Sequence, residues 1–271
     1  MIRRAQPWLG TMVEVTIPDA HDLAAADAAF AEVARVHRLM SFHDAASDVS
    51  RVNRADPGDA VEVDADTWQV LRIAQELAEL SGGAFDIACA PRLVAWEVLP
   101  PPAPARPQAR PVQEVIALEE GKRVRKLAAG WIDLGGIAKG YAVDVAVAAL
   151  RQAGMASGCV NAGGDLRVFG PSPMPVAVRS PAAPGQAASR IMLADEALAT
   201  SASYFSRRSS GGRQVSALVD ARDGRALVAD RSASVRAPRC VLADALAKVV
   251  LATGDATHPA LQACGASAFL V

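Results

Sequence analysis

The chain has 271 residues and a mass of 28.1 kDa, which is enough for one large domain or two small ones. Its formal net charge of -1 gives no indication of nucleic-acid binding, and no apolar run is long enough to span a membrane. Only 4% of the residues are aromatic, so we expect a core of small aliphatic side chains.

The N-terminal stretch "MIRRAQPWLGTMVEVTI" contains two arginines but no apolar segment after them, so we read no signal peptide in it. As the sequence stands this predicts a cytoplasmic protein, and export would require a leader upstream of it. The four cysteines are far apart and form no CxxC pair: Cys89, Cys159, Cys240 and Cys264. We therefore expect buried thiols rather than a metal site or a disulfide framework.

Four helices are expected in chain order: residues 22–40, residues 64–80, a stretch from the turn at 135–136 to near Gly154, and residues 242–254. Asp22 can cap the first helix, and Asp64 or Asp66 the second. Short apolar runs predict strands at 12–17, 124–127, 159–160, 166–169, 175–178, 191–193 and 215–219. Two helices precede most of the strands, so the pattern indicates an α+β fold with mixed or antiparallel sheets.

A proline-rich stretch, "PPPAPARPQARP", occupies residues 100–111. Proline at this density favours polyproline II and excludes helix. A domain linker and an SH3-type ligand are alternatives. We expect a surface excursion within one domain that spans residues 1–271, because neither side looks self-sufficient.

The stretch "WIDLGGIAKGYAVD" (131–144) reads as a buried strand, a glycine turn and the start of a helix. It is not a Walker A loop, because Lys139 precedes Gly140, and it lacks the GxGxxG fingerprint of dinucleotide-binding folds. Unshielded N–H groups at a helix start nevertheless favour anions, and Lys139 adds a cation. A tight connection with a solvated lysine is an equally good interpretation of this motif alone.

Two further glycine-containing segments carry acids. In "VNAGGDLRVFG" (160–170), Asn161 and Gly163-Gly164 predict a hairpin turn, with Asp165 as a turn residue. In "SGGAFDIACAP" (81–91), Asp86 follows an aromatic residue within an apolar segment. A carboxylate there needs a partner, a metal or the polar edge of a ligand.

Together with "MSFHDAASDVSRVNR", "ATSASYF", "LVDARDG" and "ADALAKVV", these elements in this order resemble the ApbE family from about Gly10 to Gly254. The resemblance implies an ApbE-like fold and an FAD:protein FMN transferase that uses Mg²⁺. Such an enzyme cleaves FAD, attaches FMN to a threonine or serine of an acceptor flavoprotein and releases AMP. This is phosphoryl transfer, in which positioning and charge neutralisation supply most of the catalysis.

The resemblance also implies roles for individual residues. It assigns the carbonyl of Gly136 and the carboxylate of Asp244 to a metal ion. It assigns contacts with FAD to Met40, Ala84, Phe85, Asp86, Asp133, Lys139 and Val219, and it identifies no catalytic residue that this chain retains.

Two departures from the family pattern fall on its chemistry. Ala217 replaces a histidine implicated in catalysis, and a methyl group cannot transfer a proton. Lys248 replaces a metal-ligating threonine four residues after Asp244, and an ammonium has no lone pair for a metal. Our hypothesis is that Lys248 supplies part of the metal's charge. The alternative is that Lys248 extends outward and Asp244 still holds Mg²⁺. Ala202, where the family has glycine, is a milder change.

Three functions remain open at this stage. The chain is a working flavin transferase, or a diverged protein that binds FAD without transferring FMN, or a metal-free pyrophosphatase that releases FMN and AMP. Ala217 and Lys248 favour the second reading, and the extent of the resemblance favours the first.

Overall fold

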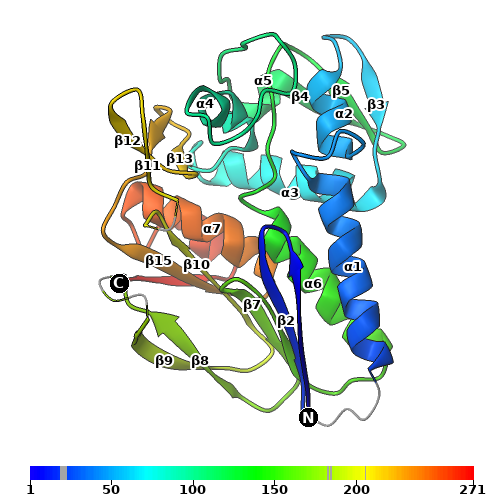
Figure 1. Ribbon diagram of the computed structural model, residues 1–271, viewed down its shortest axis with the longest axis vertical. Helices are drawn as coiled ribbons and strands as arrows, with labels where there is room; N and C mark the ends of the chain where they lie inside the picture. Colours follow the sequence, from blue (N-terminus) through cyan, green and yellow to red (C-terminus); the bar gives the residue numbers. More distant parts are fainter. Residues whose placement is uncertain (19–22, 182, 184, 205) are drawn as a thin grey trace. The chain divides into compact units, whose positions relative to one another are not determined.

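The computed structural model describes residues 1–18, 23–181, 183, 185–204 and 206–271. Contacts divide the chain into two compact units (Figure 1). Unit 1 comprises residues 1–37, 137–202 and 230–271, and unit 2 comprises residues 38–136 and 203–229. The first glycine motif therefore straddles a border between the units, after Gly136.

Unit 1 is built on a seven-stranded sheet in which all neighbouring strands are antiparallel. Its strands, in spatial order, are β1 (Ile2–Trp8), β2 (Thr11–Ile17), β6 (Gly158–Ala162), β7 (Asp165–Phe169), β10 (Ala197–Ala202), β15 (Ser232–Ala237) and β16 (Ser267–Leu270). The hairpin between β6 and β7 turns at Gly163 and Gly164, both of which have positive φ, as the sequence predicts. The expected α+β class is confirmed.

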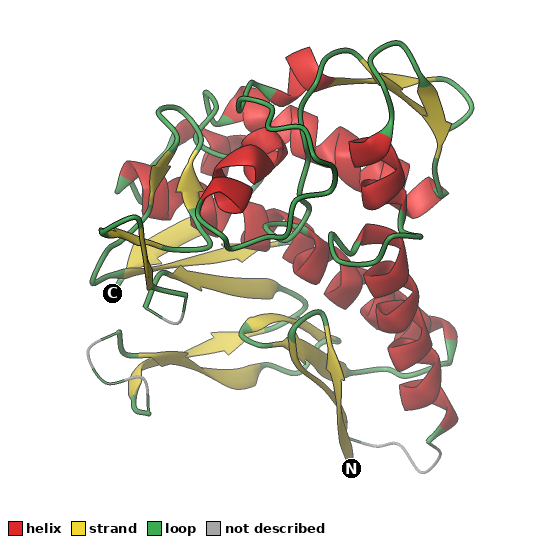
Figure 2. Ribbon diagram, turned by 45° about the horizontal axis from the view of Figure 1, so that its top comes forward, coloured by secondary structure: helices red, strands yellow, loops and turns green. Residues whose placement is uncertain are grey.

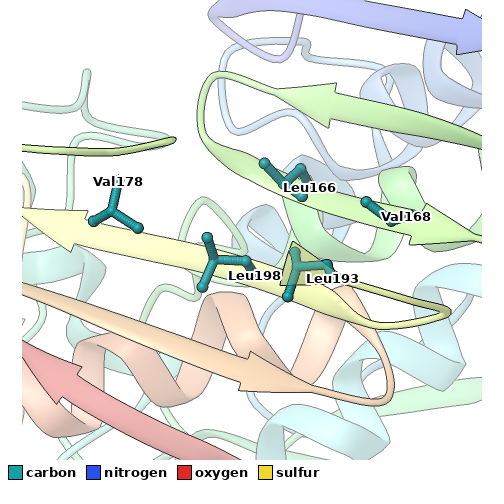
Figure 3. Packing of buried hydrophobic residues seen from close by; sticks show 5 residues of the cluster. All are labelled: Leu166, Val168, Val178, Leu193 and Leu198. Carbon is teal, nitrogen blue, oxygen red and sulfur yellow. The ribbon is translucent and has the colours of Figure 1, made fainter. Parts of the chain in front are cut away.

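Two helices, α6 (Ala138–Gln152) and α7 (Cys240–Thr253), pack against each other and against this sheet (Figure 1). The period of two in β7 separates its side chains. Asp165 and Arg167 bond to the helix α6, whereas Leu166 and Val168 belong to a cluster on the other face. The hairpin of β8 (Met174–Arg179) and β9 (Ala187–Leu193) completes that cluster with Val178 and Leu193 (Figure 3).

Helices α6 and α7 approach each other closely at Gly140. A Cβ atom at this position would lie 2.3 Å from the carbonyl oxygen of Cys240 and 2.8 Å from Cβ of Asp244. One turn further along α6, Asp144 accepts from the backbone N–H groups of Cys240 and Val241, both at 3.0 Å. The carboxylate of one helix thus caps the N-terminus of the other, which lacks a cap of its own.

The remaining helices of unit 1 are α1 (Ala24–Met40), whose last residues belong to unit 2, and α8 (Pro259–Ala263). All four expected helices are present, the second as α3 (Ala65–Leu80) with Asp64 as its N-cap. The proposed cap Asp22 lies outside the described residues. None of the described helices combines the length and apolarity needed to cross a membrane.

Unit 2 consists mainly of short helices and small sheets (Figure 2). Besides α3, its helices are α2 (Asp48–Arg54), η1 (Ile87–Cys89), α4 (Ala90–Ala95) and α5 (Val112–Val115). A three-stranded sheet has the order β3 (Ala60–Glu62), β5 (Arg123–Lys126), β4 (Ile116–Glu119). Two hairpins follow: β11 (Arg208–Ser210) with β12 (Arg213–Val215), and β13 (Val219–Asp220) with β14 (Arg225–Ala226).

The strand expected at 215–219 is wrong, because residues 216–218 separate β12 from β13. The buried hydroxyl of Ser216 donates to the carbonyl of Leu227 and accepts from the N–H of Leu218, at 2.7 and 3.1 Å. A side chain therefore takes over hydrogen bonds that a strand would give to its neighbour.

The strand expected at the start of residues 131–144 is also wrong. Residues 131–134 are largely buried but lie in no sheet. Their backbone bonds instead to the side chain of Asn53, which pairs with both the N–H and the carbonyl of Ile132 at 2.8 and 2.9 Å. The N–H of Asp133 donates to the carbonyl of Ile87 at 2.8 Å. The buried backbone is satisfied without a strand partner.

Candidate functional site

Four charged side chains of unit 1 form a buried group that we call the lysine–aspartate cluster: Lys139, Asp165, Asp244 and Lys248. Lys139 forms a short ion pair with Asp165, and its ammonium lies 3.5 Å from Oδ1 of Asp244. Lys248 forms a short ion pair with the same Oδ1 and also donates to the backbone carbonyl of Asp244 at 2.8 Å. Opposite charges therefore alternate through the cluster.

Local structure explains why these residues meet. Asp244 and Lys248 are four residues apart on α7, so they share a helix face. Lys139 lies in the first turn of α6, and Asp165 begins β7 directly after the glycine hairpin. The sequence predicts Asp165 only as a turn residue, since nothing local reveals that the hairpin and α6 meet.

The start of α6 also contributes. The N–H of Gly140 belongs to the first turn, whose donors lack intrahelical partners, and it donates to Oδ2 of Asp244 at 2.9 Å. The sequence predicts that N–H groups here favour an anion. In this structure the carboxylate of Asp244 is that anion.

Electrostatics favour the charged forms of Lys139 and Asp244. Burial disfavours the charged form of Lys139, but Asp165 and Asp244 outweigh it and raise its pKa above the usual value. Burial likewise opposes ionisation of Asp244, yet Lys139, Lys248 and the Gly140 N–H hold its pKa below the usual range. Burial and the charge of Asp244 raise the pKa of Asp165, an effect that Lys139 opposes.

The metal that the resemblance implies does not fit this arrangement of side chains. Asp244 is fully buried, and both of its carboxylate oxygens accept hydrogen bonds from the protein. An ammonium group lies where a cation would bind Oδ1. Within the residues that the structure describes, no three His, Cys, Asp or Glu side chains are grouped to hold a metal. Gly136, the second residue assigned to the metal, is half-buried in the turn before α6.

In unit 2, Asp86 has the partners that the sequence requires, and they are backbone groups. Its Oδ1 accepts from the N–H of Ala88 at 2.7 Å as the N-cap of η1, and its Oδ2 accepts from the N–H of Val112 at 2.9 Å. Burial raises the pKa of Asp86, and both hydrogen bonds oppose the rise. Asp86 thereby fixes the segment that follows residues 100–111.

The N–H of Asp133 donates to the carbonyl of Ile87, so Asp133 lies beside η1, the short helix that Asp86 caps. Burial raises the pKa of Asp133, while the Gly135 N–H, at 3.1 Å from Oδ1, and the nearby His43 oppose the rise. His43 is a neighbour that sequence reasoning does not identify. Of the other positions assigned to FAD in unit 2, Met40, Ala84 and Phe85 are buried and Val219 is half-buried in β13.

Ala217 is exposed in the connection between β12 and β13, and its N–H donates to the hydroxyl of Ser206 at 3.3 Å. Its methyl group supplies no proton acceptor. Asp220, the last residue of β13, pairs with Arg222 at 2.7 Å.

The four cysteines all lie in the described part of the chain and form no disulfide; Cys240 is buried as expected, whereas Cys89, Cys159 and Cys264 are half-buried. Burial, with additional repulsion from Asp133 and Asp86, raises the pKa of Cys89, and burial raises the pKa of Cys159 to about 12. These thiols therefore stay protonated near neutral pH and do not act as nucleophiles.

Residues 101–111 contain no helix or strand. Part of this segment borders a cavity of about 660 Å³ within unit 2. The cavity is lined by Pro91, Arg92, Val94, Ala95, Glu97, Arg106, Pro107, Gln108, Ala109 and Trp131.

The fold and the site define an α+β protein with an antiparallel sheet and a buried lysine–aspartate cluster at a glycine-containing helix start. A model of the ApbE family matches residues 9–269, and the chain belongs to this family. The resemblance read from the ordered motifs is therefore confirmed.

Individual proteins agree with this assignment. The chain is 30% identical over 272 residues to the FAD:protein FMN transferase of Rhodobacter capsulatus, covering 94% of this chain but only 52% of that protein. It is 28% identical over 239 residues to the FAD:protein FMN transferase of Vibrio cholerae, covering 81% of this chain and 70% of that protein. The crystal structure of the ApbE protein of Thermotoga maritima superimposes with a TM-score of 0.84 at 26% identity, covering 100% and 94% of the two chains.

Proposed function

We propose that the protein is an FAD:protein FMN transferase, which attaches FMN to a threonine or serine of an acceptor flavoprotein. The observation that carries the proposal is the match to the ApbE family over residues 9–269, together with two relatives that bear this activity as their name. Because the chain spans about half the length of the Rhodobacter relative, the activity, the substrate and the acceptor are all proposals.

The proposed reaction is a phosphoryl transfer. The acceptor hydroxyl oxygen forms a bond to the FMN phosphorus, the bond from this phosphorus to the bridging oxygen breaks so that AMP leaves, and the hydroxyl proton passes to solvent, because Ala217 offers no acceptor. We propose that FAD contacts Met40, Ala84, Phe85, Asp86, Asp133, Lys139 and Val219. Lys139 retains 29% side-chain exposure while it is paired with Asp165, so part of this side chain stays open to a ligand.

A second candidate function is binding of FAD without transfer. Two observations favour it. Ala217 offers no group to accept the proton, and Lys248 is paired to Asp244 where the family pattern has a metal ligand. The proposed Mg²⁺ requirement and the metal roles of Gly136 and Asp244 thus depend on whether Lys248 can be displaced.

One assay separates the two candidates. Purified protein is incubated with FAD, Mg²⁺ and a flavoprotein that carries FMN on a threonine when it is modified, and flavin fluorescence is read after denaturing electrophoresis. A fluorescent acceptor band that disappears when the acceptor threonine is replaced by valine supports the transferase. FAD binding without a fluorescent band contradicts the transferase and supports the second function.

The double variant Ala217→His with Lys248→Thr tests the cause of a negative result. It restores a proton acceptor and removes the ammonium beside Asp244. If wild-type protein binds FAD but does not transfer FMN, we expect the double variant to gain transfer. Continued inactivity with intact FAD binding would exclude these two positions as the explanation.

A further inference from the structure

The lysine–aspartate cluster is electrically balanced by its own side chains. Lys139 and Lys248 contribute two positive charges, and Asp165 and Asp244 contribute two negative charges, all within one ion-paired group. Only four lysines occur in the chain, and two of them lie here. An additional divalent cation would add two charges to a buried group that is already neutral.

Both carboxylate oxygens of Asp244 already accept from donors of the protein. Lys248 donates to its Oδ1 and to its backbone carbonyl, and Gly140 donates to its Oδ2. Mg²⁺ and Mn²⁺ bind through oxygen lone pairs, whereas an ammonium has donors only. A hard cation bound to the same oxygen would lie against the positively charged Lys248 ammonium, and this repulsion disfavours metal binding while the ion pair is intact.

The side chain of Lys248 does not extend into solvent. Its side chain is only 12% exposed, and the carboxylate that it contacts is fully buried. Moving the ammonium outward would break the ion pair with Lys248 and leave the buried carboxylate with the longer 3.5 Å contact to Lys139, and weakening a buried ion pair is destabilising. Lys248 is therefore an integral part of the cluster.

We infer that the ammonium of Lys248 takes the place of a divalent cation at Asp244, so that this protein binds its nucleotide without a metal ion. The first half of the inference concerns only the cluster. The second half, on nucleotide binding, rests on the proposed function. Lys248 then balances the charge of Asp244 in place of the metal ion.

Manganese binding to the protein alone tests the first half. Free Mn²⁺ gives an electron paramagnetic resonance signal that is lost when the ion binds, so titration counts bound ions directly. We expect wild-type protein to leave the signal unchanged. Lys248→Thr gives the cluster a net charge of -1 and an oxygen ligand, and it should bind one Mn²⁺ at least about tenfold more tightly than wild type, or about 1.4 kcal/mol.

Two further variants isolate the cause and guard against misfolding. Lys248→Arg retains the charge and should remain unable to bind Mn²⁺. Lys248→Met removes the charge without adding an oxygen, fills the same space, and should still gain Mn²⁺ binding if Lys248→Thr does not fold. One equivalent of Mn²⁺ on wild-type protein, bound as tightly as on Lys248→Thr, would overturn the inference.

Flavin fluorescence titrations test the second half. We expect the dissociation constant of FAD for wild-type protein to differ by less than about twofold between EDTA and Mg²⁺, and that of Lys248→Thr to improve about tenfold with Mg²⁺. A tenfold improvement in wild type would refute metal-free binding. If neither protein binds FAD, the proposed function fails, while the manganese result still decides the role of Lys248.

Discussion

Lys126 is a buried lysine outside the lysine–aspartate cluster, and it lies in β5 of unit 2 with 2% of its surface exposed. Its ammonium donates to the backbone carbonyl of Gly130, and the structure shows no carboxylate paired with it among the described residues. Burial lowers the pKa of Lys126 from 10.5 to about 8. Unlike the lysines of the cluster, Lys126 therefore opposes folding when it is protonated.

This difference in pKa predicts a specific pH dependence of stability. Between pH 8 and 10.5 the unfolded chain keeps the Lys126 proton that the folded chain has lost, so the free energy of unfolding rises with pH, by roughly 3 kcal/mol in total. Lys126→Met should lack this rise and be more stable than wild type at pH 7 by about 1–3 kcal/mol. Urea unfolding at several pH values measures both effects.

The exposed Lys122, four residues earlier, provides the control for Lys126→Met. Lys122→Met should follow the wild-type pH profile, because its ammonium stays in water in the folded state. A constant difference in free energy of unfolding between wild type and Lys126→Met across pH 7–10.5 would show that burial does not shift the pKa of Lys126.

At the scale of elements, the contact between α6 and α7 depends on Gly140. Alanine ordinarily stabilises a helix interior by about 1 kcal/mol relative to glycine. At Gly140 the added methyl would overlap the Cys240 carbonyl, which lies 2.3 Å from the Cβ position. We expect Gly140→Ala to lower the free energy of unfolding by about 2–3 kcal/mol, measured by urea unfolding, because the helices must separate.

Gly185 is the matched control for Gly140. A Cβ atom there has no neighbour within 4 Å, and the backbone is outside the left-handed region. Gly185→Ala should change the free energy of unfolding by less than about 0.5 kcal/mol. Equal effects of the two substitutions would contradict the close helix contact.

Local sequence patterns predict those helices and turns whose stability depends on residues close together in the chain. The periodicity of residues 64–80 and the cap at Asp64 define α3, and the two glycines after Ala162 define the β6–β7 hairpin. Residues 131–134 appear as a strand in the sequence because they are apolar, but the distant Asn53 satisfies their backbone. Asn53 and Ile132 are 79 positions apart, so a pattern read over a few neighbouring residues does not include Asn53.

The same limit applies to the candidate site. The i,i+4 spacing of Asp244 and Lys248 indicates their contact on one helix, and the structure contains it. The ion pair of Lys139 with Asp165 joins residues 26 positions apart, and the Gly140–Asp244 bond joins residues 104 positions apart. The neutral cluster emerges only when α6, α7 and β7 pack together.

At the scale of the molecule, both units are assembled from segments that are far apart in the chain. Unit 1 uses three segments and unit 2 uses two. In unit 1, β2 pairs with β6, and in unit 2, β3 pairs with β5. A cut within residues 100–111 therefore separates strands that are partners in each unit, although the segment itself contributes no strand.

This interlaced topology predicts that a nicked protein stays assembled. A protease recognition site inserted between Pro104 and Ala105, both exposed, allows one cut in the folded protein. We expect the cut protein to elute from gel filtration at the volume of the intact protein, to give two bands on a denaturing gel, and to separate in urea. Uncut protein with the same insertion is the control. Separation of the fragments under native conditions would show that pairing across the cut is too weak to hold either unit together.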